Sequence, residues 1–188
     1  DEEKSVVTYQ ISESDPTGVL DPPDFNEFQR IIDLKSIDLG EDGVFIIQDE
    51  DWVFDAIGLP VHGGRQLEKI EYEVVQSVTN QATENMSVSS SIVLDLWKRG
   101  LNTRSGFKYG TKWRCYPSDV GEGHAPWLVV DPSSDNPKNW AEACLSSRLA
   151  SGVNKHWLYP INDRANGWRY LQISRPPSDS RWSNPIRH

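Results

Sequence analysis

Three side chains in the C-terminal half of this 188-residue chain could manage the proton transfers of a phosphoryl-transfer reaction. Tyr116 and His124 are eight residues apart, and Lys155 follows thirty-one residues later. A phenol and an imidazole can accept or donate protons, and an ammonium can stabilise negative charge as it develops on phosphate oxygens. The set could therefore supply base, acid and charge stabiliser for an internal phosphoryl transfer that needs no metal ion.

Each of the three residues also has a more ordinary explanation when it is taken alone. A tyrosine at the end of a strand usually packs in the core or at its rim, and a histidine after Gly121-Glu122-Gly123 usually lies in a loop. A lysine at the end of a helix is most often solvated. The chemical interpretation therefore depends on whether order and spacing place all three in one recognisable frame.

Two helices are predicted ahead of these residues. Apolar side chains recur at helical spacing from Gln66 to Thr79, and a second such pattern begins near Ser90 and stops at Gly100. The polar, serine-rich segment between them, Asn80–Ser91, predicts a loop or hinge.

After Gly100 the pattern changes to short apolar or aromatic runs separated by clusters of Pro, Gly, Asn and Asp, which predicts strands. One further helix is predicted over Asn139–Ala150. Strands combined with helices in this way indicate an α+β fold, an α/β mixed sheet flanked by helices. The predicted strands are Thr111–Tyr116, Trp127–Asp131, His156–Tyr159 and Trp168–Ile173.

The segment before residue 66 gives weaker signals. Phe25–Leu39 is compatible with a short helix or with extended structure, and Val44–Ile47 reads as a short strand. We therefore expect a small α+β structural module over residues 1–86, followed by the domain that carries the candidate residues over 87–188.

Charge is unevenly distributed along the chain. The net charge of −9 argues against a simple nucleic-acid-binding protein, for which a basic surface is usual. Residues 1–60, however, hold sixteen acidic and three basic side chains, whereas residues 95–188 hold eight acidic and fourteen basic ones. A polyanion could therefore approach the C-terminal half. The plainer role of the acidic half is to keep the protein in solution.

Composition bounds the setting and the cofactors. No apolar run approaches the length of a membrane span, and no signal peptide is visible, although the chain opens on Asp1 without an initiator methionine. Cys115 and Cys144 are too few for a disulfide framework and lack metal-ligand spacing, so we expect buried thiols. The expectation is an intracellular protein, cytoplasmic or nuclear, with no metal, no cofactor and no membrane association.

Several short runs, taken in order, resemble the catalytic domain of the tRNA-intron (splicing) endonucleases. Each run is weak alone, but the ordered combination is specific, and it covers roughly residues 90–175. Two departures are a slightly shorter loop between Tyr116 and His124, and Asn154 at a position that is often basic. The runs are Leu94-Asp95-Leu96-Trp97-Lys98-Arg99-Gly100, Gly106-Phe107-Lys108-Tyr109-Gly110, Arg114-Cys115-Tyr116, His124, and Arg148 through Lys155.

The resemblance implies a role for each candidate residue. Tyr116 matches the general base that acts on a ribose 2′-hydroxyl, His124 the acid that protonates the departing 5′-oxygen, and Lys155 the cation that stabilises the transition state. The implied substrate is precursor tRNA with bulge-helix-bulge-like splice sites. The implied products are 2′,3′-cyclic phosphate and 5′-hydroxyl ends. The RNA supplies its own nucleophile, so the protein has only to align it and move two protons.

The resemblance also implies an RNA clamp and an assembly surface. Arg148 would hold a flipped base against Trp168, although a helix-face salt bridge and a half-buried strand aromatic are their plainer roles. Assembly would use the strand at 168–174 and an acidic loop with Asp131 and Asp135, which could instead be a surface turn with two exposed aspartates. We expect an oligomer, formed by copies of this chain or with related endonuclease subunits.

Two alternatives to an active RNA endonuclease remain open. The first is a non-cutting structural subunit of the same assembly, which would have no chemical need for all three candidate residues. The second is a metal-dependent DNA nuclease, which needs clustered carboxylates. Acidic residues between 100 and 175 are scattered, so this second alternative is the least favoured.

Overall fold

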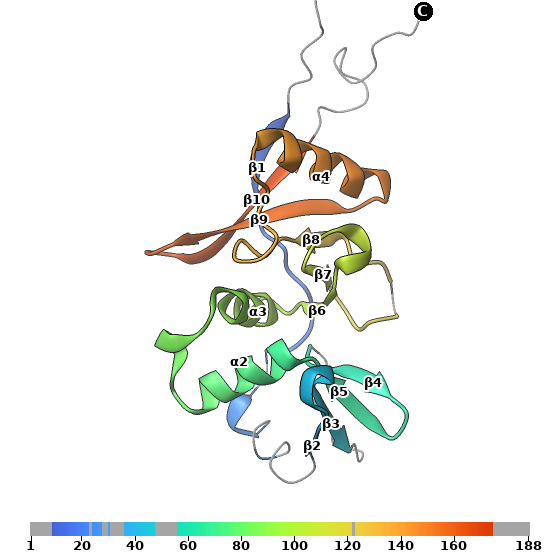
Figure 1. Ribbon diagram of the computed structural model, residues 1–188, viewed down its shortest axis with the longest axis vertical. Helices are drawn as coiled ribbons and strands as arrows, with labels where there is room; N and C mark the ends of the chain where they lie inside the picture. The colour runs from blue at the N-terminus through green and yellow to red at the C-terminus, as the bar shows by residue number, and fades with distance from the viewer. Residues whose placement is uncertain are drawn as a thin grey trace, which may run out of the picture. The chain divides into compact units, whose positions relative to one another are not determined.

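The computed structural model describes residues 9–22, 24–27, 30, 36–47, 56–121 and 123–174 (Figure 1). Helices and strands both contribute substantially, which confirms the expected α+β class. Contacts within the chain define two compact units. Unit 1 comprises residues 1–15, 105–113 and 126–188, and unit 2 comprises residues 16–104 and 114–125. These units follow different boundaries from the expected division at residue 87.

Unit 1 contains four strands in the order β1-β10-β9-β8. β10 pairs antiparallel with both β1 and β9, whereas β8 and β9 are parallel. Parallel neighbours need a crossover, and helix α4 provides it between β8 and β9. These elements are β1 (Gln10–Ser14), β8 (Trp127–Val129), α4 (Trp140–Gly152), β9 (His156–Asp163) and β10 (Gly167–Ser174).

Helix α4 lies beside β9 and β10 and closes the core of unit 1 (Figure 1). Its N-terminus is capped by Asn139, whose side-chain oxygen accepts a hydrogen bond from the Glu142 amide at 2.9 Å. The Glu142 carboxylate in turn accepts from the Lys138 amide at 2.7 Å. The buried core residues are Leu128, Val130, Ala143, Cys144, Ala150, Trp157 and Ile173.

Strand β1 was not predicted, and it pairs with one edge of β10. Gln10-Ile11-Ser12 lies antiparallel to Gln172-Ile173-Ser174, with Ile11 opposite Ile173, so two identical tripeptides pair symmetrically. Over residues 170–172, β10 therefore has a paired strand on each side. Residues 170–174, part of the strand expected to pair with another unit, therefore pair with β1 of the same chain, and a role of β10 in assembly stays a prediction.

Unit 2 contains a four-stranded antiparallel sheet in the order β2-β3-β5-β4, followed by two helices that pack on each other. Val44–Ile47 is a strand, as predicted, and Phe25–Leu39 lies partly outside the described residues. The elements are β2 (Ser36–Asp38), η1 (Gly40–Asp42), β3 (Val44–Ile47), β4 (Leu59–Val61), β5 (Gly64–Leu67), α2 (Lys69–Thr79), η2 (Thr83–Asn85) and α3 (Val88–Lys98).

Helix α2 begins three residues later than predicted because Gly64–Leu67 pairs with β3 and β4 as strand β5. Glu68 then caps the helix, and Glu68 and Glu71 form a capping box. Two further short strands, β6 (Asn102–Ser105) and β7 (Trp113–Tyr116), are neighbours. They enclose the loop with the short helix η3 (Phe107–Tyr109).

A buried carboxylate joins three segments of unit 2. Glu71 is only 2% exposed and accepts hydrogen bonds from the Gly58 amide at 3.0 Å and the Glu68 amide at 2.9 Å. The Arg104 guanidinium, itself 5% exposed, lies 3.3 Å from the same carboxylate. Removing one member of such a pair leaves an uncompensated buried charge, so the pair is a point of high sensitivity.

We predict that Glu71→Ala lowers the free energy of unfolding by about 3 kcal/mol, because two backbone amides lose their acceptor and Arg104 keeps only the more distant Glu68 carboxylate, at 4.0 Å. Urea denaturation measures this change. Glu73→Ala, an exposed site on the same helix, serves as the matched control and should change stability by no more than about 0.5 kcal/mol. Equal losses in the two variants would contradict the structural role of Glu71.

Candidate functional site

Backbone hydrogen bonds hold the main chain of Lys155 just after helix α4 ends. Its amide donates to the Ala150 carbonyl at 2.9 Å, and the Asn154 amide donates to the Ser151 carbonyl at 3.1 Å. Asn154 has a φ of 58°, so this is the left-handed helix ending that favours Gly or Asn. Backbone conformation therefore accounts for Asn154, where the resemblance led us to expect a basic residue.

The side chain of Lys155 is 8% exposed, and its ammonium nitrogen lies 4.9 Å from the centre of the Tyr109 ring. The ammonium of Lys108 lies 5.9 Å from the same ring. Both Tyr109 and Lys155 belong to unit 1. Tyr109 belongs to the Gly106–Gly110 motif, but the sequence assigned it no role. Its spacing from Lys155 along the chain does not indicate that the two side chains are in contact.

Tyr116 ends β7 and is 8% exposed, in unit 2. The guanidinium carbon of Arg114 lies 5.7 Å from the centre of its ring. Residues two apart on a strand share a face, so alternation along β7 could have revealed this pair in advance. Among the residues that the structure describes, none forms an ion pair with Arg114, which leaves a cation beside the candidate base.

His124 is exposed and precedes the buried residue Ala125 and strand β8. Like Tyr116 it belongs to unit 2, whereas Lys155 belongs to unit 1. Each side chain therefore has surroundings that suit a catalytic role within its own unit: one buried cation, one phenol beside a cation, and one imidazole open to solvent. Their convergence on a single phosphodiester stays a prediction.

The two clamp candidates both lie in unit 1. Arg148 is exposed on α4, and within the described part of the chain it forms no ion pair, so the alternative role in a helix-face salt bridge is not seen there. Trp168 is half-buried on β10 opposite Asn162. The adjacent Arg169 is engaged by Glu13 at 2.5 Å and 2.8 Å and by Asp163 at 3.4 Å, which favours Trp168 as the clamp residue.

The acidic loop differs from the expected surface turn with two exposed aspartates. Asp131 is 1% exposed, and its carboxylate accepts from the Ser133 amide at 2.9 Å and the Ser133 hydroxyl at 2.6 Å. Asp135 is half-buried and accepts from the Asp131 amide at 2.6 Å. Desolvation, the largest cause, and the charge of Asp131 raise the pKa of Asp135. Both carboxylates thus shape the loop itself, and their role in assembly stays a prediction.

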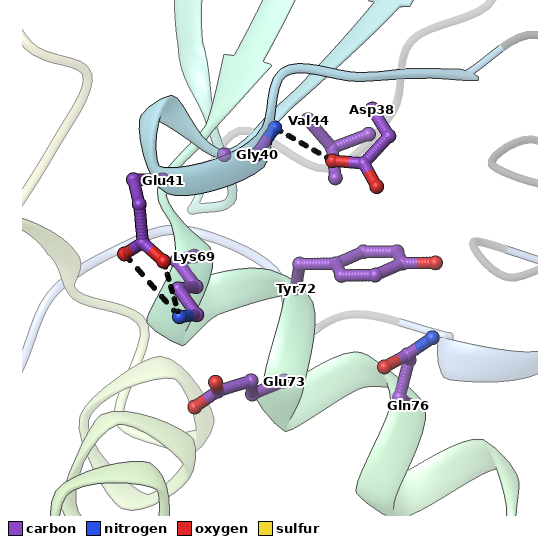
Figure 2. Close-up of a pocket in the computed structure, with 9 residues that line it drawn as sticks. Asp38, Gly40, Glu41, Val44, Lys69, Tyr72, Glu73 and Gln76 are labelled. Carbon is purple, nitrogen blue, oxygen red and sulfur yellow. Dashed lines mark hydrogen bonds and ion pairs between the residues drawn. The ribbon is translucent and has the colours of Figure 1, made fainter.

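Unit 2 contains a pocket of about 310 Å³ between α2 and the segment from β2 to β3 (Figure 2). Asp38, Glu41 and Glu73 contribute three carboxylates to it, against the single ammonium of Lys69, which Glu41 already binds at 3.2 Å. The side chain of Tyr72 lies among them (Figure 2). Negative charge of this kind repels phosphates, so the pocket is unsuited to a nucleic acid.

Within the ranges given above, no group of three or more His, Cys, Asp or Glu side chains is placed to hold a metal ion. No described helix combines the length and apolar character needed to cross a bilayer. Cys115 and Cys144 are free and buried, as expected, and burial raises the pKa of both thiols.

The chain is similar in sequence to several known proteins. Residues 88–170 match the family model described as tRNA intron endonuclease, catalytic C-terminal domain. The tRNA-splicing endonuclease of Picrophilus torridus is 32% identical over 158 residues, which are 84% of this chain and 48% of that protein. That of Thermoplasma volcanium is 29% identical, over 93% of this chain and 53% of that protein. That of Saccharolobus islandicus is 23% identical, over 83% of this chain and 80% of that protein.

The chain spans about half the length of the first two relatives. The segment that matches the family model contains all three chemical candidates, Tyr116, His124 and Lys155, and both clamp candidates, Arg148 and Trp168. The family was identified from ordered motifs in the same segment, and the comparisons confirm it. The chain belongs to the tRNA intron endonuclease family, whose catalytic domain it carries over residues 88–170.

Proposed function

We propose that this chain cuts precursor tRNA at the ends of its intron, by a reaction that uses no metal ion. The observation that carries the proposal is the match of residues 88–170 to the catalytic C-terminal domain of the tRNA intron endonucleases, a segment that contains Tyr116, His124 and Lys155. The names of the relatives supply the substrate class: they are tRNA-splicing endonucleases.

In the proposed reaction, Tyr116 accepts the proton of a ribose 2′-hydroxyl, and the 2′-oxygen attacks the adjacent phosphorus. A bond forms between phosphorus and the 2′-oxygen while the bond to the 5′-oxygen breaks, and His124 donates a proton to that leaving oxygen. Lys155 stabilises the charge that builds on the other phosphate oxygens. The products are a 2′,3′-cyclic phosphate and a 5′-hydroxyl, and no water is consumed.

The local electrostatics support these roles. The guanidinium carbon of Arg114 lies 5.7 Å from the centre of the Tyr116 ring, so the proposed base has a cation beside it. The backbone of Lys155 is held by the hydrogen bond from its amide to the Ala150 carbonyl, which fixes the point from which its side chain extends. The surplus of basic residues over 95–188 also attracts a polyanion to this half of the chain.

Substrate recognition and assembly complete the proposal. Arg148 and Trp168 hold a flipped base of a bulge-helix-bulge-like splice site. Two splice sites require two catalytic domains, so the working enzyme is an oligomer of this chain or an assembly with related subunits. The loop with Asp131 and Asp135 contributes to that assembly. A subunit of the same assembly that does not cut is the second candidate, and the next experiment separates the two.

We predict that the protein cleaves an intron-bearing precursor tRNA in EDTA, and that His124→Ala slows the cleavage by roughly 10²–10⁴-fold because the leaving oxygen loses its acid. Rates are measured on labelled RNA at saturating protein. The matched control is His62→Ala, which replaces an exposed histidine in the turn between β4 and β5 and should cut at the wild-type rate.

Equal rates for His124→Ala and wild type would remove His124 as the acid. If neither protein cuts, the non-cutting subunit is favoured, and cleavage that EDTA abolishes would support metal-dependent chemistry.

We also predict that Arg148→Ala slows cleavage of a bulged substrate by about tenfold or more, because stacking on one base contributes about 1–3 kcal/mol. Arg164→Ala removes an exposed arginine from the turn between β9 and β10 and is the charge-matched control. The comparison uses kcat/KM on the same RNA. A similar loss in both variants indicates a general charge effect and contradicts the clamp.

A further inference from the structure

The loop between β6 and β7 is built in one conformation by two glycines. A Cβ atom at Gly106 would lie 2.5 Å from the Thr111 hydroxyl oxygen and 2.9 Å from its carbonyl oxygen, and Gly110 has a φ of +74°. The Gly106 amide donates to the Lys112 carbonyl at 2.9 Å, and the Tyr109 amide donates to the Gly106 carbonyl at 2.8 Å. The motif Gly106–Gly110 therefore specifies a closed turn.

This turn presents its side chains in different directions. Phe107 is 90% exposed, whereas Tyr109 is half-buried and packs against the core of unit 1. The ring of Tyr109 thus has a fixed place, set by core packing on one side and by the turn on the other. A fixed ring can serve as a platform for a neighbouring cation.

Lys155, which belongs to another segment of unit 1, lies beside the Tyr109 ring. Its backbone is held at the end of α4, its side chain is 8% exposed, and its ammonium lies 4.9 Å from the ring centre. An ammonium is attracted to an aromatic face, and the attraction is stronger where water is excluded from the cation. Lys108 is exposed and lies farther away, at 5.9 Å, so Lys155 is the stronger partner of the ring.

We propose that Tyr109 is a positioning residue, whose ring fixes the Lys155 ammonium where cleavage requires it. This inference rests on the proposed function, because it assumes that Lys155 stabilises the transition state. A lysine ammonium lies at the end of a flexible four-carbon stem and so needs such a support to hold its charge at one place. The aromatic face performs this task, and the phenol hydroxyl of Tyr109 does not take part.

The contact itself can be tested without any cleavage. A proton above an aromatic face resonates upfield, so the Hε protons of Lys155 should be displaced from those of the other lysines in an NMR spectrum. Loss of the signal in Lys155→Ala assigns it. We expect the displacement to persist in Tyr109→Phe and to vanish in Tyr109→Leu. Ordinary Hε shifts for Lys155 in the wild-type protein would overturn the proposal.

Kinetics on precursor tRNA then test the positioning role. We expect Tyr109→Leu to lower kcat by about tenfold with KM nearly unchanged, and Tyr109→Phe to restore the wild-type rate because it keeps the ring. In a Lys155→Ala background, Tyr109→Leu should cause no further loss, since the two residues act as one unit. Tyr159→Leu is the control for packing, because Tyr159 borders the same core; it should leave kcat unchanged. Thermal unfolding of each variant separates lost stability from lost positioning.

The outcomes distinguish this inference from the proposed function. If Lys155→Ala is slow while Tyr109→Leu cuts at the wild-type rate, the positioning role fails and the proposed function stands. If Lys155→Ala cuts like wild type, the catalytic role of Lys155 fails and the inference fails with it. A Tyr109→Phe variant as slow as Tyr109→Leu would assign the effect to the hydroxyl and overturn the role of the ring.

Discussion

The contact of the Lys155 ammonium with the ring of Tyr109 constrains much of unit 1. A charged group taken out of water is costly unless the fold compensates for it, so the segments around Lys155 have little freedom. Helix α4 must end sharply, which it does through the left-handed Asn154. The loop between β6 and β7 must bring the Tyr109 ring to Lys155, and the backbone conformation at Gly106 and Gly110 allows this. The position of Lys155, the proposed charge stabiliser, thus accounts for motif residues to which no chemical role is assigned.

Charge segregation is the second organising feature. The N-terminal module carries most of the acidic residues, and its pocket has three carboxylates. The segment that matches the catalytic domain carries a basic surplus and holds two cations beside tyrosines, Lys155 at Tyr109 and Arg114 at Tyr116. Whole-chain charge alone would argue against an RNA substrate, whereas its distribution favours one.

Local patterns were enough to predict the helices α3 and α4 and the strands β9 and β10. Their apolar spacing is regular, and the helices are capped by Ser87 and Asn139, whose side chains accept hydrogen bonds from the first turn. Strand β1 could not be predicted, because it is polar and exposed and its partner β10 lies more than 150 residues away along the chain. Leu67 was assigned to a helix on its spacing, but pairing with β3 makes it part of β5.

At the candidate site, too, some residues could be predicted from the sequence and others could not. Ordered motifs identified Tyr116, His124 and Lys155, and strand alternation could have added Arg114. The partnership of Tyr109 with Lys155 depends on tertiary packing between segments more than forty residues apart, which sequence spacing does not encode. Burial of Asp131 was likewise unpredictable, because a loop aspartate is usually exposed and only its bonds to Ser133 explain its place.

We propose that the RNA supplies its own nucleophile and that the protein only aligns it and moves protons. A precursor tRNA with one 2′-deoxynucleotide at one splice junction, incubated with the protein in EDTA, tests this proposal. We expect the deoxy junction to stay intact while the unmodified junction is cut to a 2′,3′-cyclic phosphate and a 5′-hydroxyl. Cleavage at the deoxy junction would contradict it.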